Sequence, residues 1–394
     1  MTIITSLFLF VLAVPATLSC GYLLLLTVLS GKPGIPAPKA RTLRFNVIVP
    51  AHNEAAIIER TIASLLGIDW PRDRFRVVVI ADNCSDDTAA VARAAGAEVW
   101  ERSDAANRGK GYALQYAFAA SRDGHWADAV VVVDADSEAS PNLLQAFAAR
   151  IESGMEAVQS HYGVRNPMAS WRTRLITIAK GSFHIVRSRA REKLGLSCGI
   201  RGNGWCVTHK LLERVPYEAF SLTEDVEYGI TIGLAGYRVA YADEAHSDAD
   251  MVSSEDIARR QRQRWEDGRF QLIRSKTPLL LAAALARRSA VCLDLAIDLM
   301  VLPLSYVALN VLALAALAGL GYWLRLTPAG WLWTAGAAVL GLALYVARGW
   351  QLSGVGPGGI WDLARVPWFL DWKLWLILKR RDSKEWVRTK RESH

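Results

Sequence analysis

The chain has 394 residues, of which 52% are hydrophobic and 21% charged, and its mean hydropathy is +0.16. A soluble enzyme of this size rarely has a positive mean hydropathy, so the composition excludes a purely soluble globule, a disordered chain and a collagen-like repeat. The net charge is +8, from 46 Lys and Arg against 38 Asp and Glu residues. No nucleic-acid-binding motif accompanies this excess, so we expect no nucleic-acid partner.

The first predicted element is a membrane anchor. Residues 2–30 contain no charged side chain, and about 20 apolar residues suffice to cross a hydrocarbon core ~30 Å thick. The run lacks a basic start and is longer than the apolar region of a signal peptide, so we predict an uncleaved transmembrane helix over residues 1–30. The linker at 31–44 carries four basic and no acidic residues, and positive charge beside a membrane segment marks the cytoplasmic side.

An alternation of apolar strands and amphipathic helices follows. We predict strands at residues 45–50, 75–82, 97–101 and 129–134, and helices at residues 55–66, 86–95 and 109–120. This alternation indicates βαβ units and a mostly parallel sheet with helices on both faces, within a cytosolic α/β domain at 45–276. Ligands of such sheets bind beyond the carboxyl ends of the strands, where Asp82, Asp134 and Asp136 stand.

Membrane-like sequence returns after residue 276. We predict that residues 277–298 lie along the membrane interface and that the uncharged runs 299–324 and 326–347 form a transmembrane hairpin. Residues 360–378 mix four tryptophans with charged side chains, which predicts an amphipathic interfacial helix kinked near Pro367; a helix packed on the cytosolic domain is the alternative. The tail within 348–394 is basic, so both basic clusters fall on the cytosolic side and attract anionic lipid headgroups.

Two carboxylates stand one residue apart directly after an apolar strand, in Asp134-Ala135-Asp136. Side chains at this spacing point toward one side and suit a hard divalent cation that bridges phosphate oxygens. The cation would neutralise the charge that develops on a nucleotide diphosphate leaving group. The alternative is a solvated turn.

A second acidic motif is Thr223-Glu224-Asp225. A sugar hydroxyl is a poor nucleophile, and a carboxylate that accepts its proton typically accelerates transfer roughly 10²- to 10⁴-fold. The alternative is a helix N-cap at Thr223, and both interpretations can hold together.

The third motif is a Q-x-x-R-W string, Gln261-Arg262-Gln263-Arg264-Trp265. Guanidinium and amide groups can contact a pyrophosphate, and an indole offers a flat face to a sugar ring. The alternative is an ordinary basic helix near a membrane surface.

The order of these motifs is more specific than any one of them. Together they resemble the D, DxD, TED, QxxRW series of membrane-bound family-2 glycosyltransferases, which include cellulose, chitin and hyaluronan synthases and bacterial exopolysaccharide glycosyltransferases. The resemblance covers about residues 45–270, and Asn107-Arg108-Gly109-Lys110-Gly111 is similar to the family's N-x-G-K-G loop. One departure is Ala81-Asp82-Asn83-Cys84, because the family has D-D-G-S there and only the second aspartate is kept.

The resemblance implies a GT-A nucleotide-sugar-binding fold and a role for each matched residue. It implies donor binding by Pro50, Ala51, Glu54, Asp82, Lys110, Asp134, Gln261 and Arg264. It implies acceptor binding by Asn203, Gly204, Glu224 and Trp265, and binding of Mg²⁺ or Mn²⁺ by Asp134 and Asp136. Asp225 is the implied catalytic base of an inverting transfer.

The predicted function is transfer of a sugar from a UDP-sugar to a growing glycan in surface or extracellular polysaccharide biosynthesis. The predicted location is the bacterial cytoplasmic membrane, with the catalytic domain in the cytosol. The Q-x-x-R-W string favours processive synthesis, in which other export-complex proteins are possible partners. Three spans favour a single addition to a lipid-linked oligosaccharide or lipid acceptor. A catalytically inactive nucleotide-sugar-binding partner is a remote third alternative, which the presence of the carboxylates disfavours.

Overall fold

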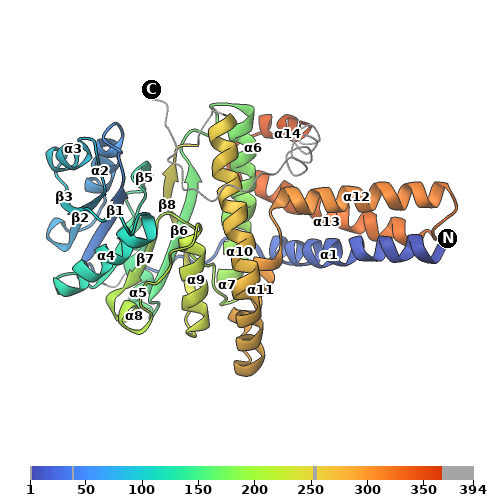
Figure 1. The fold of residues 1–394 in the computed structure, drawn as a ribbon, viewed down its shortest axis with the longest axis horizontal. Helices are drawn as coiled ribbons and strands as arrows, with labels where there is room; N and C mark the ends of the chain where they lie inside the picture. Colours follow the sequence, from blue (N-terminus) through green and yellow to red (C-terminus); the bar gives the residue numbers. More distant parts are fainter. Residues whose placement is uncertain (1, 38–39, 252–254, 366–394) are drawn as a thin grey trace. The chain divides into compact units, whose positions relative to one another are not determined.

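The computed structural model describes residues 2–37, 40–251 and 255–365. These residues divide into two compact units (Figure 1). Among the described residues, the sheet unit contains residues 32–37, 40–166, 191–251 and 255–299, and the helical unit contains residues 2–31, 167–190 and 300–365.

The sheet unit is built on eight strands in the order β3-β2-β1-β4-β7-β6-β8-β5. Their bounds are β1 Phe45–Ala51, β2 Phe75–Asp82, β3 Glu98–Arg102, β4 Ala129–Val132, β5 Ser137–Ala139, β6 Ala157–Val164, β7 Trp205–Thr208 and β8 Val239–Ala249. The pairs β1–β2, β1–β4, β2–β3 and β6–β8 are parallel, whereas β7 runs antiparallel to both its neighbours and β5 runs antiparallel to β8. The predicted mostly parallel sheet is therefore confirmed.

The predicted strands agree with the first half of the sheet, with one shortened end. The β2 strand has the predicted bounds, but β4 ends at Val132 rather than at Asp134. The reason is a turn, closed by a hydrogen bond from the amide of Ser137 to the carbonyl of Asp134 (3.1 Å). Asp134 and Asp136 therefore lie in a loop beyond the strand, where side chains are free to meet a ligand.

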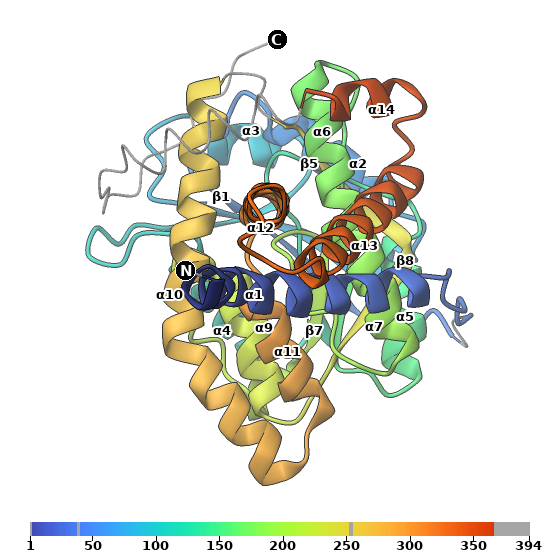
Figure 2. The same ribbon diagram turned by 90° about the vertical axis from the view of Figure 1, so that its right-hand side faces the viewer.

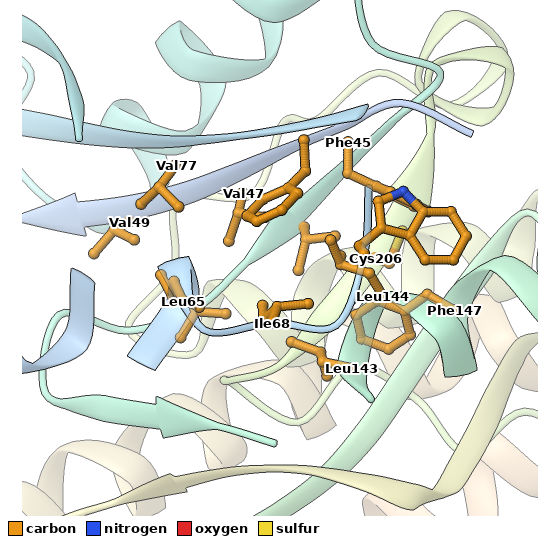
Figure 3. Close-up of a cluster of buried hydrophobic side chains, with 14 of the residues drawn as sticks. Phe45, Val47, Val49, Leu65, Ile68, Val77, Leu143, Leu144, Phe147 and Cys206 are labelled. Atoms are coloured by element: carbon orange, nitrogen blue, oxygen red, sulfur yellow. The ribbon is translucent and has the colours of Figure 1, made fainter. Parts of the chain in front are cut away.

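One face of the sheet is covered by α2 (Ile58–Leu66), α3 (Thr88–Ala94) and α5 (Leu143–Glu152). Alternate strand residues such as Val47, Val49 and Val77 point to this face, because side chains alternate along a strand. Figure 3 shows them against Leu65 of α2 and Phe147 of α5. This packing fixes the strand ends that carry the acidic residues.

The opposite face is covered by α4 (Lys110–Asp123), α8 (His209–Arg214) and α9 (Glu224–Leu234). The intervening strand residues Ile48, Val78 and Val130 join the core on this face. Helices cover both faces, as predicted. The short 3₁₀-helix η1 (Arg72–Arg74) precedes β2.

Two further helices complete the sheet unit. The helix α10 (Glu255–Arg287) is continuous across residue 276, and α11 (Ala290–Met300) follows it. Leu272 and Leu280 of α10, Leu295 of α11 and Ile230 of α9 form a separate apolar core. The interfacial location of residues 277–298 and the domain boundary at 276 stay predictions.

Within residues 2–37, 40–251 and 255–365, three helices are long and apolar enough to cross a membrane, and all belong to the helical unit: α1 (Thr2–Leu29), α12 (Leu304–Trp323) and α13 (Gly330–Ser353). Each of them contacts the other two (Figure 2). The helix α12 begins five residues later than the predicted run at 299–324, because Pro303 occupies its N-cap and a proline cannot continue a helix from α11.

Residues 167–190 form an insertion between β6 and β7 that belongs to the helical unit. It contains α6 (Trp171–Lys180), the π-helix η2 (Gly181–Val186) and the start of α7 (Arg187–Lys193). The hydroxyl of Tyr345 in α13 donates to the carbonyl of Ser182 (2.9 Å). A Cβ at Gly181 would lie 2.7 Å from the carbonyl oxygen of Gly349, so glycine permits this close approach.

The last described helix is α14 (Gly358–Leu363), whose Asp362 pairs with Arg174 of α6. The predicted interfacial helix at 360–378 lies largely outside the described residues, as does the basic tail. Its three tryptophans beyond Trp361, and the kink near Pro367, therefore stay predictions.

Candidate active site

The carboxyl ends of β2, β1 and β4 meet at one edge of the sheet. In register, Ala51 of β1 lies beside Ala81 of β2, and Ile48 of β1 lies beside Val132 of β4. Asp82 follows Ala81 directly, and Asp134 is the second residue after Val132. The predicted gathering of acidic residues at the strand ends is therefore the arrangement of the structure.

Asp82 at the end of β2 is nearly buried, with 8% of its side chain exposed. Its Oδ1 accepts hydrogen bonds from Arg102 Nη1 (2.6 Å) and from Asn83 Nδ2 (3.0 Å). The carbonyl of Asp82 lies 2.7 Å from His52 Nδ1 in the loop after β1. Arg102 and His52 thus hold Asp82 in place, and no motif in the sequence pointed to either of them.

The end of β1 and the loop after it contain the predicted donor residues Pro50, Ala51 and Glu54. Pro50 and Ala51 end the strand itself, and the amide of Glu54 donates to Thr88 Oγ1 (2.8 Å). Asn53 has a φ of 56°, in the left-handed region that asparagine tolerates better than most residues. This turn brings the loop against the start of α3.

Lys110, the first residue of α4, is the centre of the site. Its Nζ donates to Asp134 Oδ1 (2.5 Å) and to the carbonyl of Gly202 (3.1 Å), and it lies 3.7 Å from Glu224 Oε1. The exposed fractions of these side chains are 28% for Lys110, 26% for Asp134 and 15% for Glu224. One lysine therefore joins three separate loops in a cluster that solvent and a ligand can reach.

Asp225 also lies close to Gly202. A Cβ at Gly202 would be 3.2 Å from Asp225 Oδ2, and the φ of +97° at this residue also favours glycine. Lys110 and Asp225 therefore both face the same glycine, which the sequence analysis had not assigned to the site. Its only signal was that the string at residues 199–205 loosely matches the acceptor-side loop of the family that the sequence resembles.

Glu224 and Asp225 form the first turn of α9, where the helix dipole favours negative charge. Thr223 occupies the N-cap position, but its hydroxyl makes no capping hydrogen bond and is buried without a partner among the described residues. The N-cap interpretation of this motif is therefore only half right: the helix starts there, without side-chain capping.

Burial raises the pKa of Glu224 to about 7, and the charge of Lys110 opposes this rise while Asp225 adds to it. The pKa of Asp225 is also raised by burial, again against the effect of Lys110. Burial would lower the pKa of Lys110, but the charges of Asp134 and Glu224 outweigh burial and raise it. A carboxylate with a pKa near neutrality, beside a second carboxylate whose pKa is also raised, is suited to accepting a proton.

Asn203 and Gly204 are more deeply placed than an acceptor contact requires. Asn203 is fully buried, its Oδ1 accepts from the amide of Asp134 (3.0 Å) and its Nδ2 donates to Ser137 Oγ (2.8 Å). At Gly204, a Cβ would lie 2.7 Å from Ser247 Cβ. Asn203 therefore supports the turn that carries Asp134, and acceptor binding by these two residues stays a prediction.

The donor set at Asp134 and Asp136 fits a hard cation that takes most of its ligands from elsewhere. Asp136 Oδ1 accepts a hydrogen bond from Ser137 Oγ (3.2 Å). The described residues contain no group of three or more His, Cys, Asp or Glu side chains arranged to hold a metal. Mg²⁺ is usually bound by one or two carboxylates together with water and substrate phosphates, and the two aspartates provide such a set.

Gln261, Arg264 and Trp265 lie on α10. A Cβ at Gly268 would be 2.7 Å from Thr223 Cγ2, so this helix passes directly beside the start of α9. Arg264 and Gln261 precede Gly268 by four and seven residues and share its face of the helix. Arg264 Nε is buried without a hydrogen-bond partner among the described residues, and Trp265 is 38% exposed.

A family model described as "Glycosyltransferase like family 2" matches residues 43–268. The chain is 25% identical over 236 residues to the probable glycosyltransferase YdaM of Bacillus subtilis, covering 57% of this chain and 55% of that protein. It is 26% identical over 235 residues to the beta-monoglucosyldiacylglycerol synthase of Synechocystis, covering 57% of this chain and 47% of that one. The chain thus matches about half the length of these curated relatives.

The fold is similar to that of the mannosyltransferase PcManGT from Pyrobaculum calidifontis, solved in complex with GDP-Man and Mn²⁺. The TM-score is 0.51 at 22% identity, and the match covers 85% of this chain and 97% of that one. At this identity the likeness concerns the fold, which is GT-A-like α/β, as predicted.

Proposed function

The chain belongs to glycosyltransferase family 2, and from this membership we propose that it transfers a sugar from a UDP-sugar to a growing glycan of a surface or extracellular polysaccharide. The observation that carries the proposal is the convergence of Lys110, Asp134, Glu224 and Asp225 around the carbonyl of Gly202. The three apolar helices support a membrane location. The basic linker supports a cytosolic catalytic domain.

The donor would occupy the edge of the sheet from Asp82 to Asp134. Pro50, Ala51, Glu54 and Asp82 would hold the nucleoside, and Lys110 would hold the diphosphate. The unpartnered Nε of Arg264 offers a further hydrogen bond to a phosphate oxygen, and Gln261 shares its helix face. Positive groups at the diphosphate stabilise the charge that grows as it leaves.

Asp134 and Asp136 would hold Mg²⁺ or Mn²⁺. When bound, the cation supplies positive charge that neutralises the diphosphate leaving group. Lys110 holds Oδ1 of Asp134 and thereby fixes the orientation of this carboxylate. PcManGT, the relative of similar fold, was solved with Mn²⁺, which supports the same class of cation here.

Asp225 would accept the proton of the acceptor hydroxyl. The acceptor oxygen then forms a bond to the anomeric carbon while the bond from this carbon to the diphosphate breaks, and the bond electrons leave with UDP. A single displacement of this kind inverts the configuration. The raised pKa of the Glu224–Asp225 pair supports the role because a stronger base takes up the proton more readily.

A lipid acceptor is the second candidate. The relative in Synechocystis is named as a synthase of beta-monoglucosyldiacylglycerol, and three apolar helices offer little to line a pore for a polymer. Trp265, which is 38% exposed, would stack on the acceptor sugar in the first case and on a lipid-borne group in the second.

The test uses the full chain purified in detergent and reconstituted into vesicles. It is incubated with a panel of UDP-sugars, with Mg²⁺, with Mn²⁺ or with EDTA, and with either oligosaccharides or diacylglycerol as acceptor. We expect release of UDP that EDTA abolishes. When the sugar of the UDP-sugar is radiolabelled, we expect the label in the product of the reactions with oligosaccharide acceptors. Label in the lipid arm alone, or one sugar per acceptor, selects the second candidate, and no transfer from any UDP-sugar overturns the proposal.

A further inference from the structure

A second cluster of charges lies in the sheet unit, and the transfer reaction proposed above does not use it. Arg191 Nε donates to Asp294 Oδ2 (2.8 Å), and Arg191 Nη2 lies 2.8 Å from Asp298 Oδ1. Arg201 Nη2 lies 3.5 Å from Asp298 Oδ2. The exposed fraction of these side chains is 0% for Arg191 and at most 10% for the other three.

The members of this cluster stand where the chain passes between the two units. Arg191 is the first residue of the sheet unit after the insertion 167–190. Asp294 and Asp298 are on α11, and the chain leaves the sheet unit after residue 299. Buried ion pairs therefore join the point where the chain re-enters the sheet unit to the point where it leaves this unit.

The cluster also reaches the floor of the active site through Arg201. The amide of Arg201 donates to Gln159 Oε1 (2.8 Å) and its Nε donates to the carbonyl of Cys198 (2.9 Å). The next residue, Gly202, is the one that accepts from Lys110 and faces Asp225. Asp298 thus lies two contacts away from the general base.

The backbone of the loop that these contacts hold is rich in glycine. It contains three glycines with positive φ, at residues 199, 202 and 204, and glycine restricts the backbone least. A cavity of about 30 Å³ lies beside Arg201, Arg269 and Asp298. The ion pair between Arg201 and Asp298 is a directional restraint on the loop beside this cavity.

Stability alone does not account for such a cluster. Buried ion pairs are often replaceable by apolar side chains with little loss, because removing charges from water offsets their attraction. What an apolar replacement cannot supply is a fixed distance and direction. Displacements of about 1 Å in a catalytic site can cost ~10²-fold in rate.

We propose that Asp298 is a positioning residue, which fixes the Gly202 loop beneath Lys110 and Asp225 and links it to the points where the chain passes into the helical unit. The inference deepens the proposed function and rests on it. It predicts that loosening this restraint changes catalysis without changing donor binding.

The test compares Asp298→Asn with Asp294→Asn in the full chain. Both substitutions remove a buried carboxylate charge that pairs with Arg191, and Asp298 in addition pairs with Arg201 (3.5 Å). For Asp298→Asn we expect kcat to fall about 10- to 100-fold with KM for the UDP-sugar unchanged. We also expect the rising limb of the pH–rate profile to shift to higher pH. The charge of Lys110 lowers the pKa of Glu224 and Asp225, and this effect weakens when Lys110 is held less firmly beside them.

The control, Asp294→Asn, is expected to lower Tm at least as much while kcat stays within about twofold. Equal losses of kcat in the two variants, or an unchanged pH profile in Asp298→Asn, overturn the inference. Arg201→Lys, which keeps the charge, is the second variant if Asp298→Asn does not fold, with the same direction of change expected.

A readout independent of activity separates this inference from the proposed function. Hydrogen exchange of the amides at 199–204 should quicken in Asp298→Asn and stay slow in Asp294→Asn. If the wild-type chain transfers no sugar, the proposed function fails, and exchange still decides the positioning role. Unchanged protection of the loop in Asp298→Asn contradicts it.

Discussion

The two charge clusters of the sheet unit each place one basic side chain between two carboxylates, and they differ in exposure. In one, Lys110 lies between Asp134 and Glu224, and in the other Arg191 lies between Asp294 and Asp298. The side chain of Lys110 is 28% exposed and that of Arg191 is 0% exposed. Exposure thus separates a cluster that a substrate can enter from one that can only hold the chain.

The number and geometry of donors also differ. The guanidinium of Arg191 presents a fixed fork to two carboxylates, whereas the ammonium of Lys110 is a compact charge shared among three acceptors. Glu224 and Asp225, beside the lysine, keep raised pKa values. The exposed cluster therefore retains groups that can still take up a proton.

The largest expected effect is on catalysis in the exposed cluster. Asp225→Asn should lower kcat roughly 10²- to 10⁴-fold, because the amide cannot accept the proton of the acceptor. UDP binding, measured by calorimetry, should survive, and Tm should not fall. Transfer at the wild-type rate would remove Asp225 from the role of base.

The next effect is on stability in the buried cluster. Arg191→Met leaves Asp294 and Asp298 without their main cation, and we expect a loss of about 3–5 kcal/mol in the free energy of unfolding. The matched variant Lys110→Met should cost about 1 kcal/mol or less, because its carboxylates are more exposed. Denaturant or thermal unfolding of the two variants measures the difference, and equal losses would remove the contrast between the clusters.

The smallest effect is a stabilisation that depends on pH. The pKa of Glu224 is higher in the folded than in the unfolded protein, so the ionised carboxylate opposes folding. The contribution of Glu224 to the free energy of unfolding is therefore fully present below the ordinary pKa of a glutamate and is lost as the pH rises toward 7. Glu224→Gln should therefore raise stability by on the order of 1–3 kcal/mol at pH 8 and leave it unchanged at pH 4. A gain of the same size at both values would point to packing instead.

The sequence predicted the first half of the sheet closely and said little about the second. Buried parallel strands read as valine-rich runs, and β1, β2 and β4 are such runs. By contrast, β5 has three residues, β7 has four, and β6 mixes Gln159, Ser160 and His161 with apolar residues. Short or half-polar strands carry no periodic signal, and their pairing is set by contacts far along the chain.

The site was predictable where a motif recurs across a family, and not where a residue acts through its surroundings. Lys110, Asp134 and Glu224 were expected from motifs and lie together in the structure. Arg102 belongs to no motif, and Gly202 lies in a string that matches the family only loosely. Their importance comes from the side chains that they touch, and those contacts exist only once the sheet has formed.

The insertion between β6 and β7 has a consequence for biogenesis. These two strands are neighbours in the sheet, yet the segment that joins them packs against α13, which is synthesised long after it. The ribosome makes the chain from the N-terminus at a finite rate. The sheet strands on both sides of this segment can therefore pair before α13, against which the segment packs, has been synthesised. A shortened chain that stops before α12 would leave this segment bare, so recombinant expression of the catalytic part alone is expected to give aggregates unless the last helices, or a detergent in their place, are supplied.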